Sequence, residues 1–295
     1  MKVFLTGGTG FVGGAVARAL RRRGHAIRAL VRDPARARDL GEQGAELVKG
    51  DIVDAPSLRD ATRGCEAAIH LIGIIREKGR YTFEAVHTRG TTNVLAAARE
   101  AGVRRFVQMS ALGAKSGGTE YHRTKHEAEE RVRRAGIPFA ILRPSLIFGR
   151  ASPVVQLWLR MVRLSPVVPV LGDGRYRLQP VFVDDVAAAF VRAAERSELT
   201  DGVYEIAGPE VLTYDEVLDA VAQAMGKRIR KWHIPLAIVW PPVRLAAALR
   251  LPAPIAPHEL QMLLEENVAA EPANALADVF GLEPRSFREW LREAA

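Results

Sequence analysis

The sequence has a single cysteine, Cys65, and lacks a hydrophobic run long enough to cross a bilayer. One cysteine excludes an intrachain disulfide framework and is typical of a reducing compartment. The longest apolar stretch, Ile234–Val243, contains three prolines and falls short of the roughly 20 residues that a membrane-spanning helix needs. Because the first two residues lead directly into the strand-like Val3–Leu5, we expect no secretory signal. These absences predict a cytoplasmic protein, with a peripheral position at the inner face of the membrane as an alternative.

The sequence also lacks a concentrated basic tract, although its formal net charge is +8. The densest basic run, Arg21–Arg23, ends the first predicted helix, where cations complement the helix dipole. A solvated helix end therefore explains this run, and we expect no nucleic-acid partner. The charge still favours an anionic partner, such as a phosphorylated cofactor or an acidic membrane surface.

Apolar runs alternate with helical patterns through the first half of the chain, as in parallel βαβ units. The predicted strands are Lys2–Thr6, Ala26–Arg32, Ala45–Lys49, Ala67–Ile72, Arg105–Ser110 and Phe139–Arg143. The predicted helices between them are 11–23, 34–41, 56–63, 82–101 and 121–135. Six strands in this rhythm predict an α/β fold, a doubly wound parallel (Rossmann) sheet that binds its ligand at the carboxyl ends of the strands.

The rhythm changes after Gly149, which divides the chain into a predicted Rossmann domain, 1–149, and a smaller α-rich substrate or partner portion, 150–295. Some segments of the second portion could return to the first domain. Its predicted helices are 153–164, 185–196, 213–225, 257–267 and 286–294, and its predicted short strands are 177–183, 203–207 and 228–233.

A glycine-rich turn follows the first strand and opens the first helix. Gly8, Gly10 and Gly13 satisfy the pattern Gly-x-Gly-x-x-Gly, and Gly7, Gly10 and Gly13 satisfy Gly-x-x-Gly-x-x-Gly, with Phe11 and Val12 between the last two glycines. Such glycines allow a tight turn, close approach of a pyrophosphate to the backbone and close helix–strand packing. The N-terminus of the helix then offers its free N–H groups to the phosphates. The segment therefore predicts a dinucleotide site.

The end of the second strand discriminates between the two common dinucleotides. An acidic residue at this place holds the ribose of NAD, whereas an arginine pairs with the 2′-phosphate of NADP. The sequence has Arg32 followed by Asp33 and Pro34, and this Asp-Pro pair resembles a helix cap with proline at the first helical position. Arg32 is then left to face the ribose, which favours NADP(H) over NAD(H).

Beyond the glycine loop, the chain resembles the extended, atypical branch of the short-chain dehydrogenase/reductase superfamily. The similarity rests on segments 50–54, 70–73, 121–125, 143–145 and 183–186, which read GDIVD, HLIG, YHRTK, RPS and VDDV. Their combination looks most like the subgroup of the NDUFA9-type subunit of respiratory complex I. The resemblance implies cofactor contacts from Asp51, Ile52, Leu71, Ile72, Gly73, Lys125, Pro144 and Ser145.

The Tyr-x-x-x-Lys pair of this superfamily is present as Tyr121 and Lys125. Residues four apart share one face of a helix, and a neighbouring cation makes a phenol a better acid–base group at neutral pH. The resemblance implies that Tyr121 exchanges a proton with a carbonyl oxygen and that Lys125 also holds the ribose. Ser110 is the candidate for the usual catalytic hydroxyl, although it could equally cap the strand end. The helix asparagine of extended members is replaced by His87.

Other signals have ordinary explanations. His122 and His126 have metal-ligand spacing, but Arg123 beside them adds positive charge, so we expect no metal site. Arg175 and Arg177 could reach a substrate phosphate, although an ordinary surface loop is the favoured explanation.

Three functions stay open from the sequence. The first is an NADP(H)-dependent oxidoreductase acting on an unknown small molecule, such as a quinone. The second is a non-catalytic, cofactor-bound scaffold, assembly factor or redox sensor in contact with a respiratory complex or a membrane. The third is an NAD-dependent sugar-nucleotide epimerase or dehydratase.

Overall fold

The computed structural model describes residues 1–249, 251, 255–270 and 275–294. The chain divides into two compact units. The first unit comprises Met1–Pro144, Val183–Ile206 and Pro272–Glu283, and the second comprises Ser145–Phe182, Ala207–Glu271 and Pro284–Ala295. The first segment of the first unit thus ends at Pro144, whereas the predicted boundary was Gly149. Two later segments of the chain also belong to this unit.

A seven-stranded parallel sheet forms the centre of the first unit, in the order β11-β6-β5-β4-β1-β2-β3. The strands are β1 Lys2–Thr6, β2 Ala26–Val31, β3 Glu46–Lys49, β4 Ala67–His70, β5 Arg105–Met109, β6 Phe139–Pro144 and β11 Gly202–Ile206. The predicted α/β doubly wound sheet is confirmed, but the predicted number of six strands is wrong. The seventh strand, β11, pairs in parallel with β6 after the chain has passed through the second unit.

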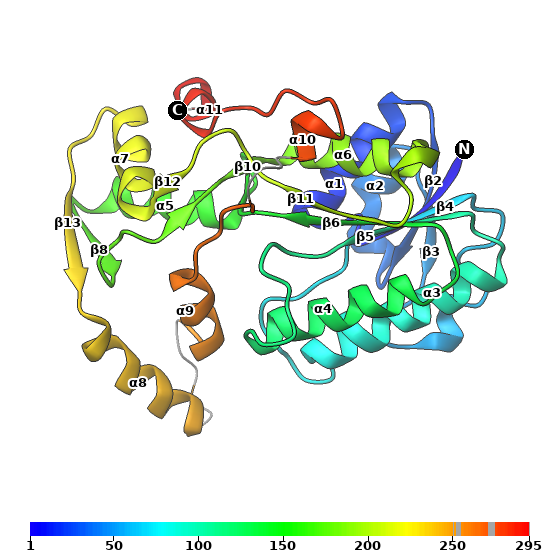
Figure 1. Cartoon of the computed structure of the whole chain (residues 1–295), viewed down its shortest axis with the longest axis horizontal. Helices are drawn as coiled ribbons and strands as arrows, with labels where there is room; N and C mark the ends of the chain where they lie inside the picture. The colour runs from blue at the N-terminus through cyan, green and yellow to red at the C-terminus, as the bar shows by residue number, and fades with distance from the viewer. Residues whose placement is uncertain (250, 252–254, 271–274, 295) are drawn as a thin grey trace. The chain divides into compact units, whose positions relative to one another are not determined.

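Helices cover both faces of this sheet (Figure 1). Helices α1 Phe11–Arg22 and α6 Val183–Glu195 pack together on one face, and α3 Gly90–Glu100 and α4 Glu120–Arg133 pack together on the other. Helix α6 is therefore one of the later segments of the chain that return to the first unit. The short elements of the unit are 3-10 turns at Pro34–Ala37, Ala55–Leu58 and Ser197–Leu199, and helices α2 Arg38–Glu42 and α10 Ala275–Asp278.

At two predicted helices of the first unit, the observed structure differs from the prediction. The predicted helix 56–63 is only a 3-10 turn, because the Ser57 hydroxyl donates to the carbonyls of Asp51 and Asp54 at 3.1 and 2.7 Å and competes with helical bonding. The predicted helix 82–101 begins with a π-helical turn, Glu84–Arg89, before α3. Such turns occur often at functional sites.

The second unit is built on three two-stranded sheets and five helices in its described part. Its strands are β7 Ile147–Phe148, β8 Val167–Leu171, β9 Arg177–Leu178, β10 Val181–Phe182, β12 Leu212–Thr213 and β13 Arg230–Ile234. Its helices are α5 Pro153–Leu164, α7 Tyr214–Ala224, α8 Leu236–Ala248, α9 Pro257–Leu264 and α11 Phe287–Ala294. The predicted strand 177–183 is two strands with different partners, separated at Pro180, whose missing N–H cannot join a ladder. No helix in the described residues is long and apolar enough to cross a membrane.

Candidate functional site

The glycine loop lies between β1 and α1 at the carboxyl edge of the sheet. Gly7 has a φ of +77°, which favours glycine, and its carbonyl accepts a hydrogen bond from Gly10 N at 3.0 Å. A Cβ at Gly13 would lie 2.0 Å from the Gly7 oxygen, so only glycine fits there. Gly10 is the N-cap of α1 and provides no side-chain cap, which leaves the N–H groups of the first turn, at Phe11 and Val12, for a ligand.

The end of β4 packs beside this loop. A Cβ at Gly7 would lie 3.3 Å from the backbone of both Leu71 and Ile72, so the two strand ends are in close contact. At the end of the same strand, the His70 ring contacts the Thr6 hydroxyl, with 2.6 Å between Nδ1 and Oγ1. Burial and the nearby Lys125 charge lower the pKa of His70 to about 3, which keeps the ring neutral.

Arg32 and Asp33 have different environments after β2. The Asp33 carboxylate accepts a hydrogen bond from Ala35 N at 3.0 Å and caps the following 3-10 turn, so its predicted structural role is confirmed. Arg32 is exposed, and its guanidinium carbon lies 5.1 Å from the centroid of the Tyr81 ring. No carboxylate of the described residues forms a salt bridge with Arg32.

Asp51 and Ile52 follow β3. One Asp51 oxygen accepts hydrogen bonds from the Tyr81 hydroxyl and the Arg80 guanidinium, both at 2.7 Å. Ile52 is buried, and its carbonyl accepts a bond from the Asn93 side chain at 2.8 Å. Arg80 and Tyr81 were not expected at the site from the sequence. The turn signal at Gly79, whose φ is +57°, is the feature that could have indicated a hairpin there.

Helix α4 carries the predicted catalytic pair. The Thr119 side chain caps this helix by accepting a bond from His122 N. Lys125 is only 2% exposed, and its ammonium donates to the Met109 carbonyl at the end of β5, at 3.2 Å. On its other side the ammonium lies 2.7 Å from where a Cβ of Gly73 would be. Lys125 thus lies between the ends of β4 and β5, and Gly73 leaves the room for it.

Burial changes the pKa of both members of the pair. It raises the pKa of Tyr121 to about 12 and lowers the pKa of Lys125 to about 8, with Glu129 opposing the second shift. The Tyr121 ring lies edge-on to His87 and Phe83, at centroid distances of 5.4 and 6.1 Å. At neutral pH the phenol therefore carries its proton, and the lysine is largely charged.

Ser110 directly follows the carbonyl that holds Lys125. Its backbone N–H donates to the Leu142 carbonyl at 2.8 Å, which ties it to β6. Its hydroxyl is buried and has no hydrogen-bond partner among the described residues. A buried hydroxyl without a partner is costly, and a ligand oxygen would satisfy it.

His87, in the π-helical turn, has a structural role that the sequence did not reveal. Its Nε2 accepts a hydrogen bond from Ile74 N at 3.1 Å, so the proton must be on Nδ1, which lies 2.9 Å from the Thr124 hydroxyl. Burial and the Lys125 charge lower the pKa of His87 to about 2. The neutral ring thus joins the loop after β4 to α4.

The remaining predicted contacts fall in two places. Pro144 ends β6, and its carbonyl accepts a bond from Leu112 N at 3.0 Å. Ser145 belongs to the second unit, where its hydroxyl donates to the Gln179 carbonyl at 2.5 Å. Arg177, weighed as a phosphate ligand, forms a two-bond ion pair with Glu266 at 2.7 Å.

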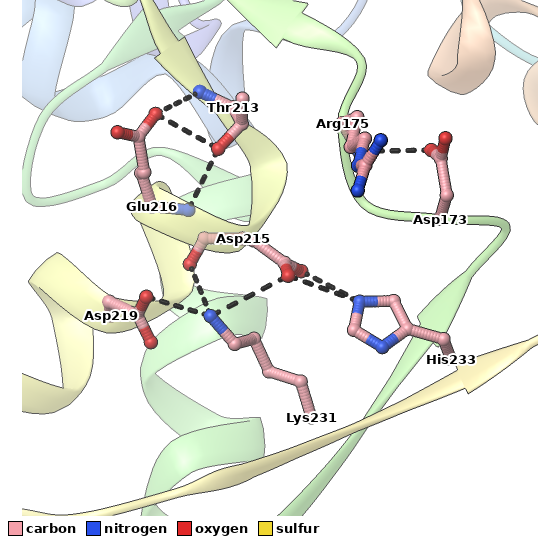
Figure 2. A network of polar contacts seen from close by, with 8 residues as sticks. All are labelled: Asp173, Arg175, Thr213, Asp215, Glu216, Asp219, Lys231 and His233. Atoms are coloured by element: carbon pink, nitrogen blue, oxygen red, sulfur yellow. Dashed lines mark hydrogen bonds and ion pairs between the residues drawn. The ribbon is translucent and has the colours of Figure 1, made fainter.

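The second unit has a polar network of its own (Figure 2). Lys231 of β13 donates to Asp219 at 2.7 Å and lies 3.6 Å from the Asp215 carboxylate, which also faces His233 at 3.1 Å. These contacts join β13 to α7. A pocket of about 580 Å³ adjoins the network, lined by Gly172, Asp173, Tyr176, His233, Pro235, Leu236 and Leu264.

Comparison with known proteins supports the resemblance seen in the sequence. The model of the NmrA-like family matches residues 1–290. A mitochondrial NADH dehydrogenase [ubiquinone] 1 alpha subcomplex subunit 9 of Arabidopsis thaliana is 31% identical over 252 residues, which are 83% of this chain and 62% of the relative. The chain thus spans under two thirds of that relative. A ceramide reductase of Caulobacter vibrioides is 32% identical over 79% of this chain and 73% of its own length.

The fold is also found among solved structures. An NADPH-dependent quinone oxidoreductase of Escherichia coli, complexed with NADPH, superposes with a TM-score of 0.80 at 22% identity and covers 99% of both chains. A UDP-glucose 4-epimerase of Thermus thermophilus superposes with a TM-score of 0.76 at 23% identity, over 99% of this chain and 97% of its own. The doubly wound fold is therefore shared with both reductases and epimerases.

Proposed function

This chain belongs to the NmrA-like family, and we propose that it is an NADP(H)-dependent oxidoreductase with Tyr121 as its acid–base group. One observation carries the proposal. The Lys125 ammonium is buried between Gly73 and the Met109 carbonyl, one helical turn from Tyr121, at the carboxyl ends of β4 and β5. Within the described residues no carboxylate contacts this buried ammonium, and an unpaired buried charge indicates a functional role.

The residues at the sheet edge fit a dinucleotide. The close approach of Gly13 to the Gly7 carbonyl leaves a backbone cradle before the uncapped N-terminus of α1, which suits a pyrophosphate. Arg32 would pair with a 2′-phosphate, while Asp33 is engaged as a cap. Leu71, Ile72 and Gly73 would lie along the nicotinamide ribose, and Lys125 would hold its hydroxyl groups.

The protonated state of Tyr121 is the one that reduction of a carbonyl or quinone requires. A bound reduced nicotinamide supplies a hydride to such a substrate. The Tyr121 phenol, protonated at neutral pH, donates its proton to the substrate oxygen that becomes negative. Lys125 stabilises the resulting phenolate by its charge. Ser110, with its unsatisfied hydroxyl, would donate a hydrogen bond to the same oxygen. The named reductase among the relatives supports this direction of reaction.

A second function is favoured by a separate observation. The similarity to a subunit of NADH dehydrogenase covers 83% of this chain, which supports a cofactor-stabilised protein in contact with a respiratory complex. In that function Tyr121 and Lys125 would stabilise the bound cofactor without turning it over.

Oxidation of NADPH by a panel of carbonyl compounds and quinones, followed by absorbance, tests the proposal. Tyr121→Phe should lower turnover by about 100- to 10,000-fold and keep the cofactor affinity, because only the transferable proton is removed. Lys125→Met should lower both the turnover and the cofactor affinity, because Lys125 would serve the phenolate and the ribose. Tyr204→Phe in β11 is the matched control and should behave as the parent. If parent and Tyr121→Phe are equally inactive while both bind the cofactor tightly, the scaffold function replaces the enzyme.

A further inference from the structure

A short hairpin after β4 reaches the ends of β2 and β3. Lys78 and Tyr81 exchange backbone hydrogen bonds of 3.0 and 3.1 Å, and Gly79 and Arg80 form the turn between them. The positive φ of Gly79 makes this tight reversal possible. The hairpin thus holds two side chains, Arg80 and Tyr81, next to residues that follow two other strands.

Four side chains form one cluster, two from just after β2 and β3 and two from the hairpin: Arg32, Asp51, Arg80 and Tyr81. The guanidinium carbons of Arg32 and Arg80 lie 5.1 and 5.2 Å from the centroid of the Tyr81 ring, within the range of cation–π attraction. The Tyr81 hydroxyl and Arg80 both bond to one oxygen of Asp51. Each member therefore fixes the position of another.

The charge of this cluster does not cancel. Asp51 neutralises Arg80, with which it shares a 2.7 Å contact, whereas Arg32 has only the aromatic face of Tyr81 as a partner among the described residues. An arginine held over a ring in a set position loses less side-chain freedom when an anion binds. The cluster thus offers a positioned arginine, Arg32, to an incoming anion.

We propose that Arg80 and Tyr81 complete the recognition site for the 2′-phosphate of NADP(H), with Arg80 donating the guanidinium N–H groups that Asp51 does not engage and Tyr81 as the positioning residue for Arg32. This inference rests on the proposed function, which assigns the dinucleotide to the same strand ends. Asp51, whose one oxygen accepts from both the Tyr81 hydroxyl and Arg80, holds the two hairpin side chains in place beside Arg32. The hairpin therefore selects the phosphorylated cofactor.

Calorimetric titration with adenosine 2′,5′-bisphosphate and adenosine 5′-monophosphate tests the site without any turnover. The ratio of the two affinities reports the 2′-phosphate alone. We expect Arg80→Gln and Tyr81→Leu each to lower this ratio by about fivefold, the value of one partly exposed charge contact. Tyr81→Phe keeps the ring beneath Arg32 and should preserve most of the ratio. Arg63→Gln removes another exposed arginine that is paired with an aspartate, and it should leave the ratio unchanged.

The outcomes separate the two proposals. If the parent prefers the bisphosphate and Arg32→Ala abolishes that preference, while Arg80→Gln and Tyr81→Leu keep it, the hairpin has no part in recognition and this inference is overturned. If the parent binds both nucleotides equally, the proposed NADP(H) preference itself fails. Circular dichroism of Tyr81→Leu at the assay temperature verifies that the fold is retained.

Discussion

Acidification should destabilise this protein through two histidines that the fold keeps neutral. His70 and His87 are 0% and 1% exposed, and their pKa values fall from an ordinary 6.5 to about 3 and about 2, because burial and the Lys125 charge oppose protonation. In the unfolded chain both rings take up a proton as the pH falls through 6.5, whereas in the folded chain they do not. The stabilising contribution is therefore present above pH 6.5 and is lost as the pH falls towards the folded pKa values.

The magnitude follows from the linkage between proton uptake and folding. One such group changes the free energy of unfolding by about 1.4 kcal/mol per pH unit below its unfolded pKa. Between pH 7 and pH 5, each histidine should cost about 2 kcal/mol of stability, and the two together about 4 kcal/mol. Urea unfolding at a series of pH values, followed by circular dichroism, measures this slope.

The matched variants keep a hydrogen-bonding group but cannot titrate. His70→Asn retains a polar atom near Nδ1, which contacts Thr6, and His87→Gln retains an acceptor near Nε2, which accepts from Ile74 N. In each variant, the free energy of unfolding should lose about half of the histidine-dependent change between pH 7 and pH 5, whatever its value at pH 7. A double variant whose slope between pH 7 and pH 5 equals that of the parent would refute the reasoning.

Three further changes test the site and its support. Gly13→Ala should abolish dinucleotide binding, since the added methyl would lie 2.0 Å from the Gly7 oxygen; fluorescence titration with NADPH checks this, and unchanged affinity contradicts it. Arg105→Met should lower the free energy of unfolding by roughly 2–4 kcal/mol, because two buried carbonyls lose their donor. Glu129→Gln should cost about 3 kcal/mol by leaving Arg143 without its buried carboxylate, and urea midpoints equal to the parent's would disprove either assignment.

Local sequence signals predicted some regular elements of both units closely. Strand β1 and helix α5 have the predicted bounds, because an apolar run ending at Gly7 and a proline at position 153 mark their limits without reference to the rest of the chain. The glycine loop was predictable for the same reason: its conformation depends on residue types that are adjacent in sequence.

Features that depend on distant residues were not predictable. Strand β11 was expected as a strand, but its place beside β6 depends on a pairing of residues about 60 positions apart. His87 has an unremarkable sequence context, and its role appears only when Ile74 N and the Thr124 hydroxyl lie on either side of the ring. The contact of Tyr81 with Arg32 and Asp51 likewise joins three strand ends that no single motif contains.

The interrupted course of the first unit has a consequence during synthesis on the ribosome. The edge of β6 pairs with β11, and α1 packs against α6, yet both partners are translated after residues 145–182. A nascent chain that ends before α6 therefore carries an open parallel sheet edge and an uncovered helix face, which are sites of self-association. Arg23 of the first segment likewise cannot form its bonds of 3.0 and 2.7 Å to Glu195 until that later residue has been synthesised. The seven-stranded sheet thus becomes complete only after all of residues 145–182 and then β11 have been synthesised.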